Sequence, residues 1–336
     1  MRKQVPYSDF RCFRFVASVA LTLILVFPSV VFAQGDGARF YWKGLAGTNA
    51  VPVIASSKSG NANPSDPSHL VSPGSDFEAT LAMPGYARMF ALFNRSAMAS
   101  VIVPVGRISG NVNVDGLDVS QTARGFGDPM LQLGINIIGP KAIKNIPDQL
   151  RYKPGFSLDI IGSLAIPIGE YDNEYQVNIG QNRWYGRIGF PIVWQLGKWV
   201  PGKRTTLEFL PAVWFFSDNN DFVGQKMETK PMLQVEGHLT RDFMERFWGS
   251  LDAIWYTGGE ATIASIDTTL NAGKLNNFGI GGTLGYQIND NLQLTIGYMS
   301  TFNDPDPEDL KLDGFTVKLI YGWHKLIEGI HRLNSE

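Results

Sequence analysis

The stretch FGIGGTLGYQINDNLQLTIGY, residues 278–298, decides the fold class of this chain. On either side of Asn289-Asp290, apolar residues alternate with glycine or polar residues. Alternation with period two predicts a half-buried β-strand, and two such strands joined by a short polar turn predict a β-hairpin. The same alternation recurs at 131–137, 156–168 and 315–323. The sequence therefore predicts a protein built from antiparallel hairpins.

Segments of this kind occur along the chain from residue 39 onward. They predict about twelve strands in one all-β domain, because no change in composition marks a domain break. The predicted strands are 39–55, 77–93, 96–109, 128–139, 155–168, 183–197, 205–217, 229–241, 247–258, 276–288, 291–302 and 313–323.

The connections between these strands alternate in length. Short connections lie at 94–95, 198–204, 242–246 and 289–290, an intermediate one at 140–154, and long ones at 56–76, 110–127, 169–182, 218–228, 259–275 and 303–312. Barrels of the bacterial outer membrane have tight periplasmic turns and long outer loops. We therefore expect a single antiparallel transmembrane β-barrel with both of its ends in the periplasm.

The first residues predict export. Four basic residues precede an apolar stretch at 15–33, which ends in Val31-Phe32-Ala33, a small-residue cleavage pattern. A membrane anchor is the alternative, but Pro28 and the cleavage pattern favour removal. We expect a signal peptide at 1–33, a barrel at 34–323 and a periplasmic tail at 324–336. The one cysteine, Cys12, lies in the signal peptide, so the mature chain has no thiol or disulfide.

Composition agrees with a barrel in contact with lipid. Charged residues make up 18% of the chain, below the roughly 25% of an average soluble protein. A formal net charge of −2 predicts no attraction to nucleic acid. Tryptophan is expected in two girdles at the lipid–water interfaces, because the predicted strand ends carry it. These tryptophans are Trp42, Trp184, Trp194, Trp199, Trp214, Trp248, Trp255 and Trp323.

The polar face of each strand is expected to line the barrel interior, since unpaired charges in lipid cost several kcal/mol. Acidic residues outnumber basic ones on this face. One interpretation is a polar, cation-tolerant passage, and the other is a core closed by ion pairs across the lumen. The predicted pore-lining residues are Glu78, Arg88, Asp159, Arg187, Glu208, Glu236, His238, Asp252 and Lys318.

Motifs that indicate catalysis are missing from the sequence. It contains no G-x-S-x-G, no H-E-x-x-H and no phosphate-binding glycine loop. His238 is interpreted as a polar lumen residue rather than a catalytic base. The acidic runs 218–221 and 303–309 do not have the spacing of an EF-hand and are interpreted as solvated loops. We therefore predict neither an enzyme nor a metal or cofactor site.

Several short motifs resemble a known family of outer-membrane proteins, grouped under the meta-pathway of phenol degradation and often labelled simply "transporter". They include Gly125-Phe126-Gly127-Asp128-Pro129 and Ile166-Pro167-Ile168-Gly169-Glu170-Tyr171-Asp172, together with Ala38-Arg39-Phe40-Tyr41, Tyr86-Ala87-Arg88 and Arg95-Ser96-Ala97-Met98-Ala99. The resemblance implies a monomeric barrel tied to the uptake of aromatic or other hydrophobic carbon sources.

The leading hypothesis is a passive outer-membrane channel for small compounds, aromatic or hydrophobic ones among them. Its expected partners are the solute itself and the lipid and lipopolysaccharide of the cell outer membrane. The alternative is a structural or adhesive barrel with a sealed lumen, in which the outer loops bind. One feature departs from most membrane barrels, which end on an aromatic residue as Trp323 would, because the chain continues to Glu336.

Overall fold

The computed structural model describes residues 35–325, except 115–116, 265–268, 303–305 and 307. The chain divides into two units, Met1–Val30 and Val31–Glu336, and all described residues belong to the second. The predicted signal peptide at 1–33 and residues 326–336 of the predicted tail lie outside the described residues.

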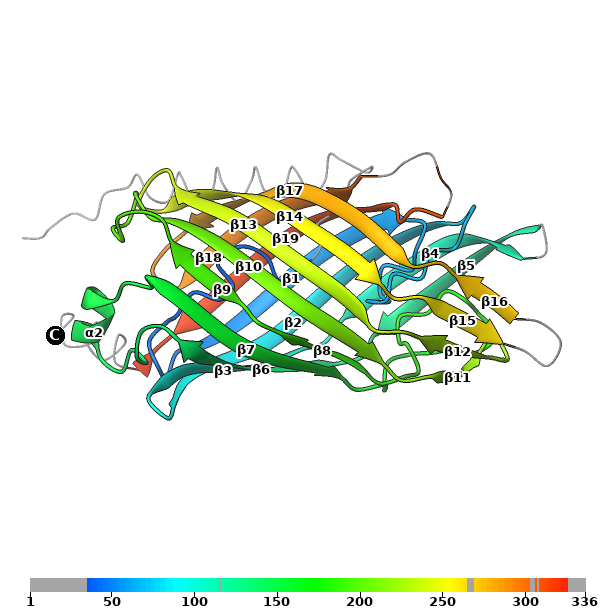
Figure 1. The fold of residues 1–336 in the computed structure, drawn as a ribbon, viewed down its shortest axis with the longest axis horizontal. Helices are drawn as coiled ribbons and strands as arrows, with labels where there is room; N and C mark the ends of the chain where they lie inside the picture. Colours follow the sequence, from blue (N-terminus) through cyan, green and yellow to red (C-terminus); the bar gives the residue numbers. More distant parts are fainter. Residues whose placement is uncertain (1–34, 115–116, 265–268, 303–305, 307, 326–336) are drawn as a thin grey trace, which may run out of the picture. The chain divides into compact units, whose positions relative to one another are not determined.

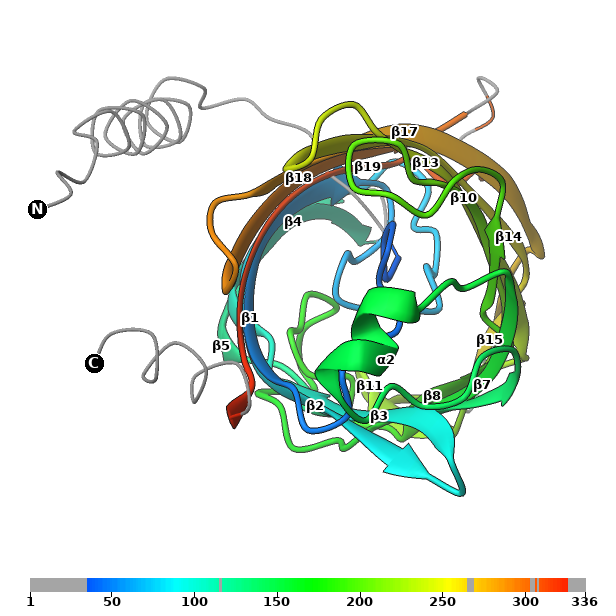
Figure 2. The same ribbon diagram turned by 90° about the vertical axis from the view of Figure 1, so that its left-hand side faces the viewer.

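Twelve antiparallel strands close into a barrel, which confirms the predicted fold class and strand number (Figures 1 and 2). The ring closes because the first strand pairs with both the second and the last. In order around the ring the strands are β1 (Asn49–Gly60), β2 (Asp76–Leu92), β3 (Arg95–Ile102), β6 (Met130–Ile138), β7 (Phe156–Ala165), the pair β8 (Tyr185–Gly189) and β9 (Ile192–Gln195), β10 (Thr205–Phe216), β13 (Met232–Asp242), β14 (Phe247–Gly258), β17 (Leu275–Gln287), β18 (Leu292–Thr301) and β19 (Leu312–Trp323).

Prolines interrupt two of these strands. β8 and β9 are halves of one strand that flanks both β7 and β10, and Phe190-Pro191 separates them. Proline has no N–H to donate to the ladder, so continuous pairing ends there. Val103-Pro104 likewise separates β3 from β4 (Val105–Val114), and both segments pair with β2.

The predicted loop at 110–127 is instead a hairpin. β4 pairs with β5 (Leu117–Phe126), and Val114 lies opposite Leu117. Asp115-Gly116 joins the two strands, and Asp-Gly between alternating residues is a strong signal for a two-residue hairpin turn. The alternation of Asn111 and Asn113 with Val112 and Val114 continues up to this turn, so the predicted strand 96–109 ended too early.

Two further predicted loops, 218–228 and 259–275, also contain strands. β11 (Asn219–Phe222), β12 (Gln225–Thr229), β15 (Ala261–Ala264) and β16 (Thr269–Ala272) form a separate four-stranded sheet at the end of the barrel that carries the long connections (Figure 1). At the other end, a short helix, α2 (Ile146–Arg151), is capped by the side chain of Asn145. Among the described residues, no helix has the length and apolarity needed to cross a membrane.

The outer face of the barrel is apolar, as period-two alternation requires. Leu133, Leu251 and Leu284 each expose more than half of their surface on this face. The predicted girdle is only partly correct, because three tryptophans point inward. Trp214 and Trp248 are 6% and 5% exposed, and Trp42 contacts Glu208 in the interior.

The first predicted strand, 39–55, is wrong over its first half. The strand begins at Asn49 and runs to Gly60. Residues 35–48, which we call the inner segment, lie inside the barrel and reach β1 only at the end that carries the short turns (Figure 2). Arg39 and Lys43 explain the difference, since both point to interior carboxylates and neither would be stable in lipid.

Candidate functional site

Seven of the nine predicted pore-lining residues face the barrel interior. Glu208, Glu236 and His238 are 2%, 1% and 6% exposed. Lys318 is partly buried and borders an interior cavity. The remaining three are Asp159, Arg187 and Asp252, which are 6%, 4% and 7% exposed.

Glu78 and Arg88 lie on the exposed face of β2, which corrects their predicted place in the interior. The inward residues near Glu78 are Phe77, Ala79 and Leu81, which pack on Val177 and Ile179 of the connection between β7 and β8. The prediction assumed that the apolar face of a strand meets lipid. That assumption fails where a folded-in connection gives the interior an apolar filling.

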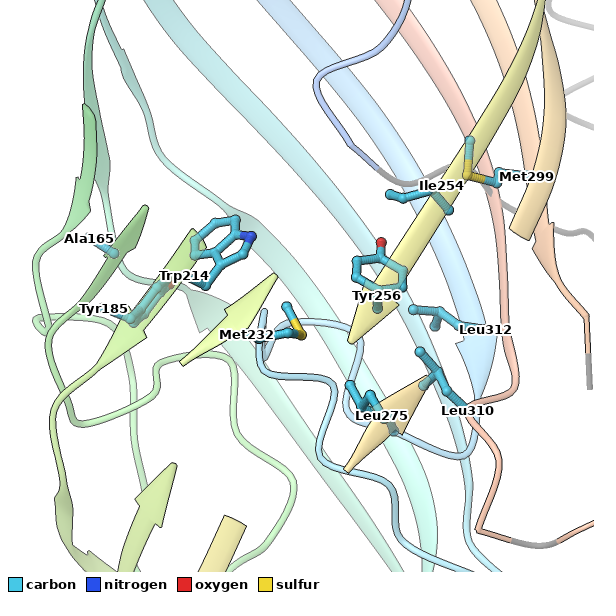
Figure 3. Packing of buried hydrophobic residues seen from close by; sticks show 11 residues of the cluster. Ala165, Tyr185, Trp214, Met232, Ile254, Tyr256, Leu275, Met299, Leu310 and Leu312 are labelled. Atoms are coloured by element: carbon cyan, nitrogen blue, oxygen red, sulfur yellow. The ribbon is translucent and has the colours of Figure 1, made fainter. Parts of the chain in front are cut away.

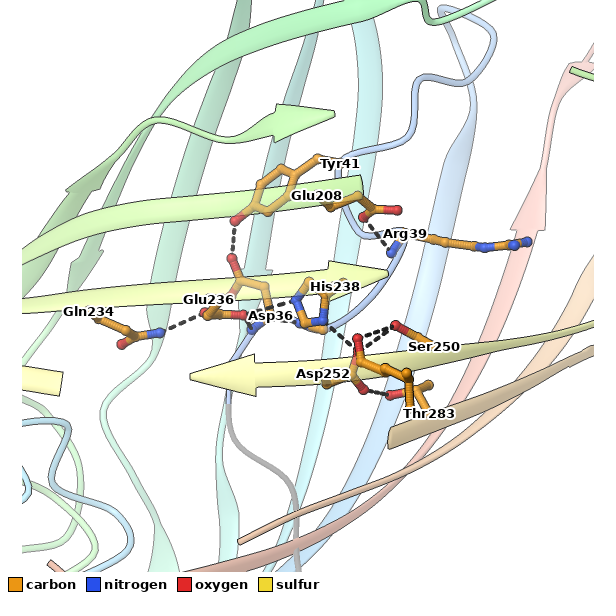
Figure 4. Close-up of polar contacts among 12 residues, drawn as sticks. Asp36, Arg39, Tyr41, Glu208, Gln234, Glu236, His238, Ser250, Asp252 and Thr283 are labelled. Atoms are coloured by element: carbon orange, nitrogen blue, oxygen red, sulfur yellow. Dashed lines mark hydrogen bonds and ion pairs between the residues drawn. The ribbon is translucent and has the colours of Figure 1, made fainter. Parts of the chain in front are cut away.

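The inner segment supplies counter-charges to the interior carboxylates. Lys43 pairs with Asp159, and the carboxylate of Asp36 pairs with Arg187. Figure 4 shows Asp36, Arg39 and Tyr41 of this segment against residues of β10, β13 and β14. Because buried charges are costly unless paired, these contacts fix where the segment lies.

Glu236 is the centre of one set of contacts. Its carboxylate accepts hydrogen bonds from the backbone N–H of Asp36 at 3.0 Å and from Gln234 Nε2 at 2.6 Å, and Arg187 Nη1 lies 3.7 Å away. Gly35 has a φ of +89°, and a Cβ built there would lie 2.3 Å from Glu236 Oε2. Glycine is therefore required for the backbone to approach this carboxylate.

Glu208 and Asp242 form a second set with Arg39. Glu208 accepts hydrogen bonds from the backbone N–H of Arg39 and from Trp42 Nε1, both at 2.9 Å. The Arg39 guanidinium pairs with Asp242 at 2.7 Å. It also lies over the Trp42 and Trp248 rings, at 4.1 and 4.2 Å from their centroids. Cation–π contacts of this kind gain strength when water is excluded.

His238 has a carboxylate at each ring nitrogen. Nδ1 lies 2.7 Å from Asp252 Oδ1, and Nε2 lies 3.5 Å from Glu236 Oε2. The hydroxyls of Ser250 and Thr283 each donate to Asp252 at 2.5 Å. Both nitrogens therefore face acids, and the imidazole is part of this polar network.

Sequence reasoning missed Asp36, Arg39, Lys43 and Asp242 as interior residues. Three of them lie in the inner segment, of which residues 39–48 were predicted to form a strand. The sequence did indicate that interior cations were missing from the prediction, because acids outnumber bases on the predicted polar faces. Since each buried acid needs a partner, the missing cations had to come from elsewhere in the chain.

An interior cavity of about 450 Å³ remains beside the inner segment. The inner segment packs against the part of the barrel formed by β7 to β10, where Tyr41 contacts Ile161 and Leu210. The cavity lies on the opposite side, against strands that include β1, β2, β17, β18 and β19. Its lining combines apolar side chains with His238, Asp252 and Lys318; the apolar ones include Pro52, Met89, Met98, Met299 and Ile320.

A buried apolar cluster lies next to this cavity (Figure 3). Met299 belongs both to the cluster and to the lining of the cavity. The cluster comprises Ala62, Ala165, Tyr185, Trp214, Met232, Ile254, Tyr256, Leu275, Met299, Leu310 and Leu312.

The connection at 61–75, called loop 61–75 below, packs on this cluster. Ala62 is a member and Val71 packs on it. Asp66 anchors the loop through both carboxylate oxygens, at 3.0 and 3.1 Å from Arg183 Nη2. The Arg183 side chain is fully buried and lies over the Phe216 ring. The ion pair and the apolar contacts therefore hold the loop against the cluster.

Comparisons with known proteins place the chain in a family. A family model described as "Putative MetA-pathway of phenol degradation" matches residues 56–319, well over half of the sequence. The chain belongs to this family. The match confirms the resemblance carried by the short motifs, and it covers most of the barrel. No curated protein matches the sequence.

Solved structures similar to this phenol-degradation family member are outer-membrane barrels. An outer membrane channel from Pseudomonas putida F1 has 18% identity and a TM-score of 0.64, over 86% of this chain and 99% of that one. The transport unit of the autotransporter AIDA-I from Escherichia coli has 10% identity and a TM-score of 0.46, over 91% and 96%. The fold is thus that of an outer-membrane β-barrel.

Proposed function

We propose that this family member is an outer-membrane channel that passively admits small apolar or aromatic compounds and is closed at rest by its inner segment. The observation that carries the proposal is the solute-sized cavity inside a closed barrel, whose lining includes a set of apolar side chains beside polar and charged ones. A cavity of this volume lies within the range of ligand pockets, about 300–1,000 Å³. The similar protein from P. putida F1 is itself an outer membrane channel.

Opening requires the inner segment to move, because the segment lies inside the barrel and borders the cavity. Its contacts include ion pairs and hydrogen bonds beside the apolar packing of Tyr41 on the barrel wall. The polar contacts can be exchanged for water when the segment leaves. The partners we propose are the solute, outer-membrane lipid and lipopolysaccharide, and we propose a monomer. We assign the protein no catalytic role.

Single-channel recording in planar bilayers tests the proposal. The mature protein is compared with a variant that lacks residues 35–44 and with a double variant, Glu208→Gln and Glu236→Gln, which weakens the contacts of the segment. We expect rare or small openings for the intact protein and larger, longer ones for both variants. Silence from all three, after demonstrated insertion, contradicts a channel.

The alternative function is a sealed barrel whose outer loops bind. The four-stranded sheet of β11, β12, β15 and β16 favours this alternative, because the sheet gives the end with the long connections a folded surface to which a partner could bind. Silence in the recordings would support this alternative, and binding by the protein on the cell surface would then be tested in place of flux.

A further inference from the structure

The interior cavity is lined by a lysine, Lys318 of β19, whose ammonium group has unused hydrogen-bond donors. The side chain is only partly buried, so it is open to the cavity. An ammonium group has three N–H donors. Among the described residues, the one acceptor for this group is the backbone carbonyl of Asp36, at 2.6 Å. The remaining donors are therefore available to a ligand in the cavity.

The inner segment fixes where the ammonium lies. Gly37 follows the accepting carbonyl of Asp36 and has a φ of +88°. A Cβ built on Gly37 would lie 2.7 Å from Lys318 Nζ. Glycine therefore lets the ammonium approach the backbone of the segment. A donor that is held in place before the ligand arrives lowers the entropy cost of binding.

The carboxylate that lines the same cavity, Asp252, has its acceptors already occupied. Its Oδ1 accepts from Ser250 and lies 2.7 Å from His238 Nδ1, and its Oδ2 accepts from Thr283 (Figure 4). A ligand hydroxyl that donates to Asp252 would compete with these bonds. A ligand oxygen that only accepts would instead use the free donors of Lys318. The site therefore favours an acceptor over a donor.

Charges of both signs surround the ammonium. The carboxylates of Asp36, Glu236 and Asp252 lie close enough to act on the charge of Lys318. An anion bound at Lys318 would lose its water beside these three acids, and a cation would meet Lys318 itself. The cavity therefore favours an uncharged ligand.

The apolar part of the lining can bury the hydrocarbon part of such a ligand. Pro52 of β1 lies opposite Ile320 of β19 in the register, and Met89 of β2 lies opposite Met98 of β3. All four line the cavity, and Ile320 is two residues from Lys318 on the same face of β19. Apolar surface removed from water here contributes to affinity. The site combines a fixed donor with room for a hydrocarbon body.

The cavity also extends to the end of the barrel that carries the short turns. Glu245 and Arg246, in the turn between β13 and β14, line it and are exposed. We therefore expect a ligand to reach the cavity of the purified protein from this end.

We propose that the interior cavity binds uncharged, largely hydrocarbon compounds that carry a carbonyl oxygen, such as ketones, with the Lys318 ammonium as the donor to that oxygen. The inference rests on the proposed channel function, because it names the class of solute that the same cavity holds. A hydroxyl compound of the same shape is expected to bind less tightly, because its O–H finds no free acceptor on Asp252.

The test measures binding of matched compounds to the mature protein in amphipol by isothermal titration calorimetry. 4-tert-Butylcyclohexanone is compared with the analogue in which a methylene group replaces the carbonyl oxygen. The corresponding alcohol and carboxylate complete the set. One hydrogen bond from a charged donor predicts that the ketone binds roughly tenfold to hundredfold more tightly than the methylene analogue. The alcohol and the carboxylate are expected to bind more weakly than the ketone.

Infrared difference spectroscopy reports the hydrogen bond itself. The ketone is bound with and without a heavy carbon isotope in its carbonyl group, and the difference spectrum isolates its C=O stretch. A hydrogen bond from Lys318 is expected to shift this band to lower frequency in the unaltered protein than in Lys318→Met.

Two variants separate the role of the ammonium from the seating of the inner segment. Lys318→Met keeps an apolar stem without a donor and is expected to bind the ketone and the methylene analogue equally. Lys43→Met is the matched control, because Lys43 also holds the segment in place, through Asp159, but does not line this cavity. It is expected to keep the preference for the ketone. Heat-modifiable migration on gels verifies that each variant forms the barrel.

Equal binding of the ketone and its methylene analogue by the unaltered protein overturns the inference, as does a preference that survives in Lys318→Met. Tighter binding of the alcohol or the carboxylate than of the ketone overturns it too, and so does a failure of all four compounds to bind. Each of these results leaves the channel proposal standing, since bilayer recordings test it without these ligands. A ketone preference in a protein that never conducts supports the binding site and refutes the channel.

Discussion

Replacing Gly35 by alanine tests whether the inner segment is seated by its contact with Glu236. A Cβ at this position would lie 2.3 Å from the carboxylate oxygen. Glu236 cannot easily turn away, because it is 1% exposed and held by Gln234 and Arg187. The segment must therefore shift, and the hydrogen bond from the N–H of Asp36 to Glu236 is lost.

The expected cost follows from two terms. A left-handed backbone costs a residue other than glycine about 1–2 kcal/mol, and a hydrogen bond to a charged group contributes about 1.5–3 kcal/mol. Together they destabilise the seated segment by roughly 2.5–5 kcal/mol. Gly155→Ala is the matched control, because Gly155 has a φ of +55° and open space around a built Cβ. It carries the backbone cost without the collision.

Thiol labelling measures the result, because the mature chain is expected to contain no cysteine. A cysteine in place of Ala38, which borders the interior cavity, reports whether the segment is seated. In the Gly35→Ala background it is expected to react with a polar maleimide at least tenfold faster than in the Gly155→Ala background. Equal rates in the two backgrounds would refute the close packing of Gly35 on Glu236.

Three further predictions concern the outer loop and the outer face. Arg183→Met leaves Asp66 as a buried unpaired charge and should weaken the docking of loop 61–75 by about 3–5 kcal/mol. Limited proteolysis should then cleave loop 61–75 faster than in the unaltered protein. An unchanged cleavage rate would contradict this prediction. His69 binds its proton more weakly in the docked loop, since its pKa there is about 3 instead of 6.5. Docking stability is therefore complete above pH 6.5 and falls on acidification, by roughly 2–3 kcal/mol at pH 4.5, which hydrogen exchange of the loop amides would measure; protection unchanged by acid would refute it. Neutralising Glu78 or Arg88 should leave conductance and ion selectivity in bilayers unaltered, because both side chains lie on the exposed face. A changed selectivity would indicate that these side chains face the lumen.

Strand number and order could be predicted from the sequence because alternation is a local property. Each strand shows its two faces within about ten residues, and short turns such as Asn289-Asp290 fix which strands are neighbours. The Asp115-Gly116 hairpin was equally local and could have been predicted from its turn residues. The information that specifies this hairpin lies within the segment itself.

The inner segment could not be predicted in the same way. Phe40 and Trp42 lie between Arg39, Tyr41 and Lys43, an alternation that a barrel strand would also show, and nothing local distinguishes the two structures. The difference lies in partners far away in the chain, since Arg39 pairs with Asp242 and Lys43 with Asp159. The same holds for Glu78, whose side of β2 depends on the apolar connection between β7 and β8 that packs inside the barrel.

The two interpretations of the interior, an open polar passage and a core closed by ion pairs, describe one charge distribution in two states. With the inner segment seated, Arg39 and Lys43 neutralise acids of the barrel wall and the lumen is a paired core. Those two cations belong to the segment, whereas Asp159 and Asp242 belong to the wall. If the segment leaves, it removes two positive charges and, with Asp36, one negative charge. The wall then keeps its acids with fewer partners, so the open state gains a negative field that the closed state lacks. The contacts that close the proposed channel therefore also mask its charge.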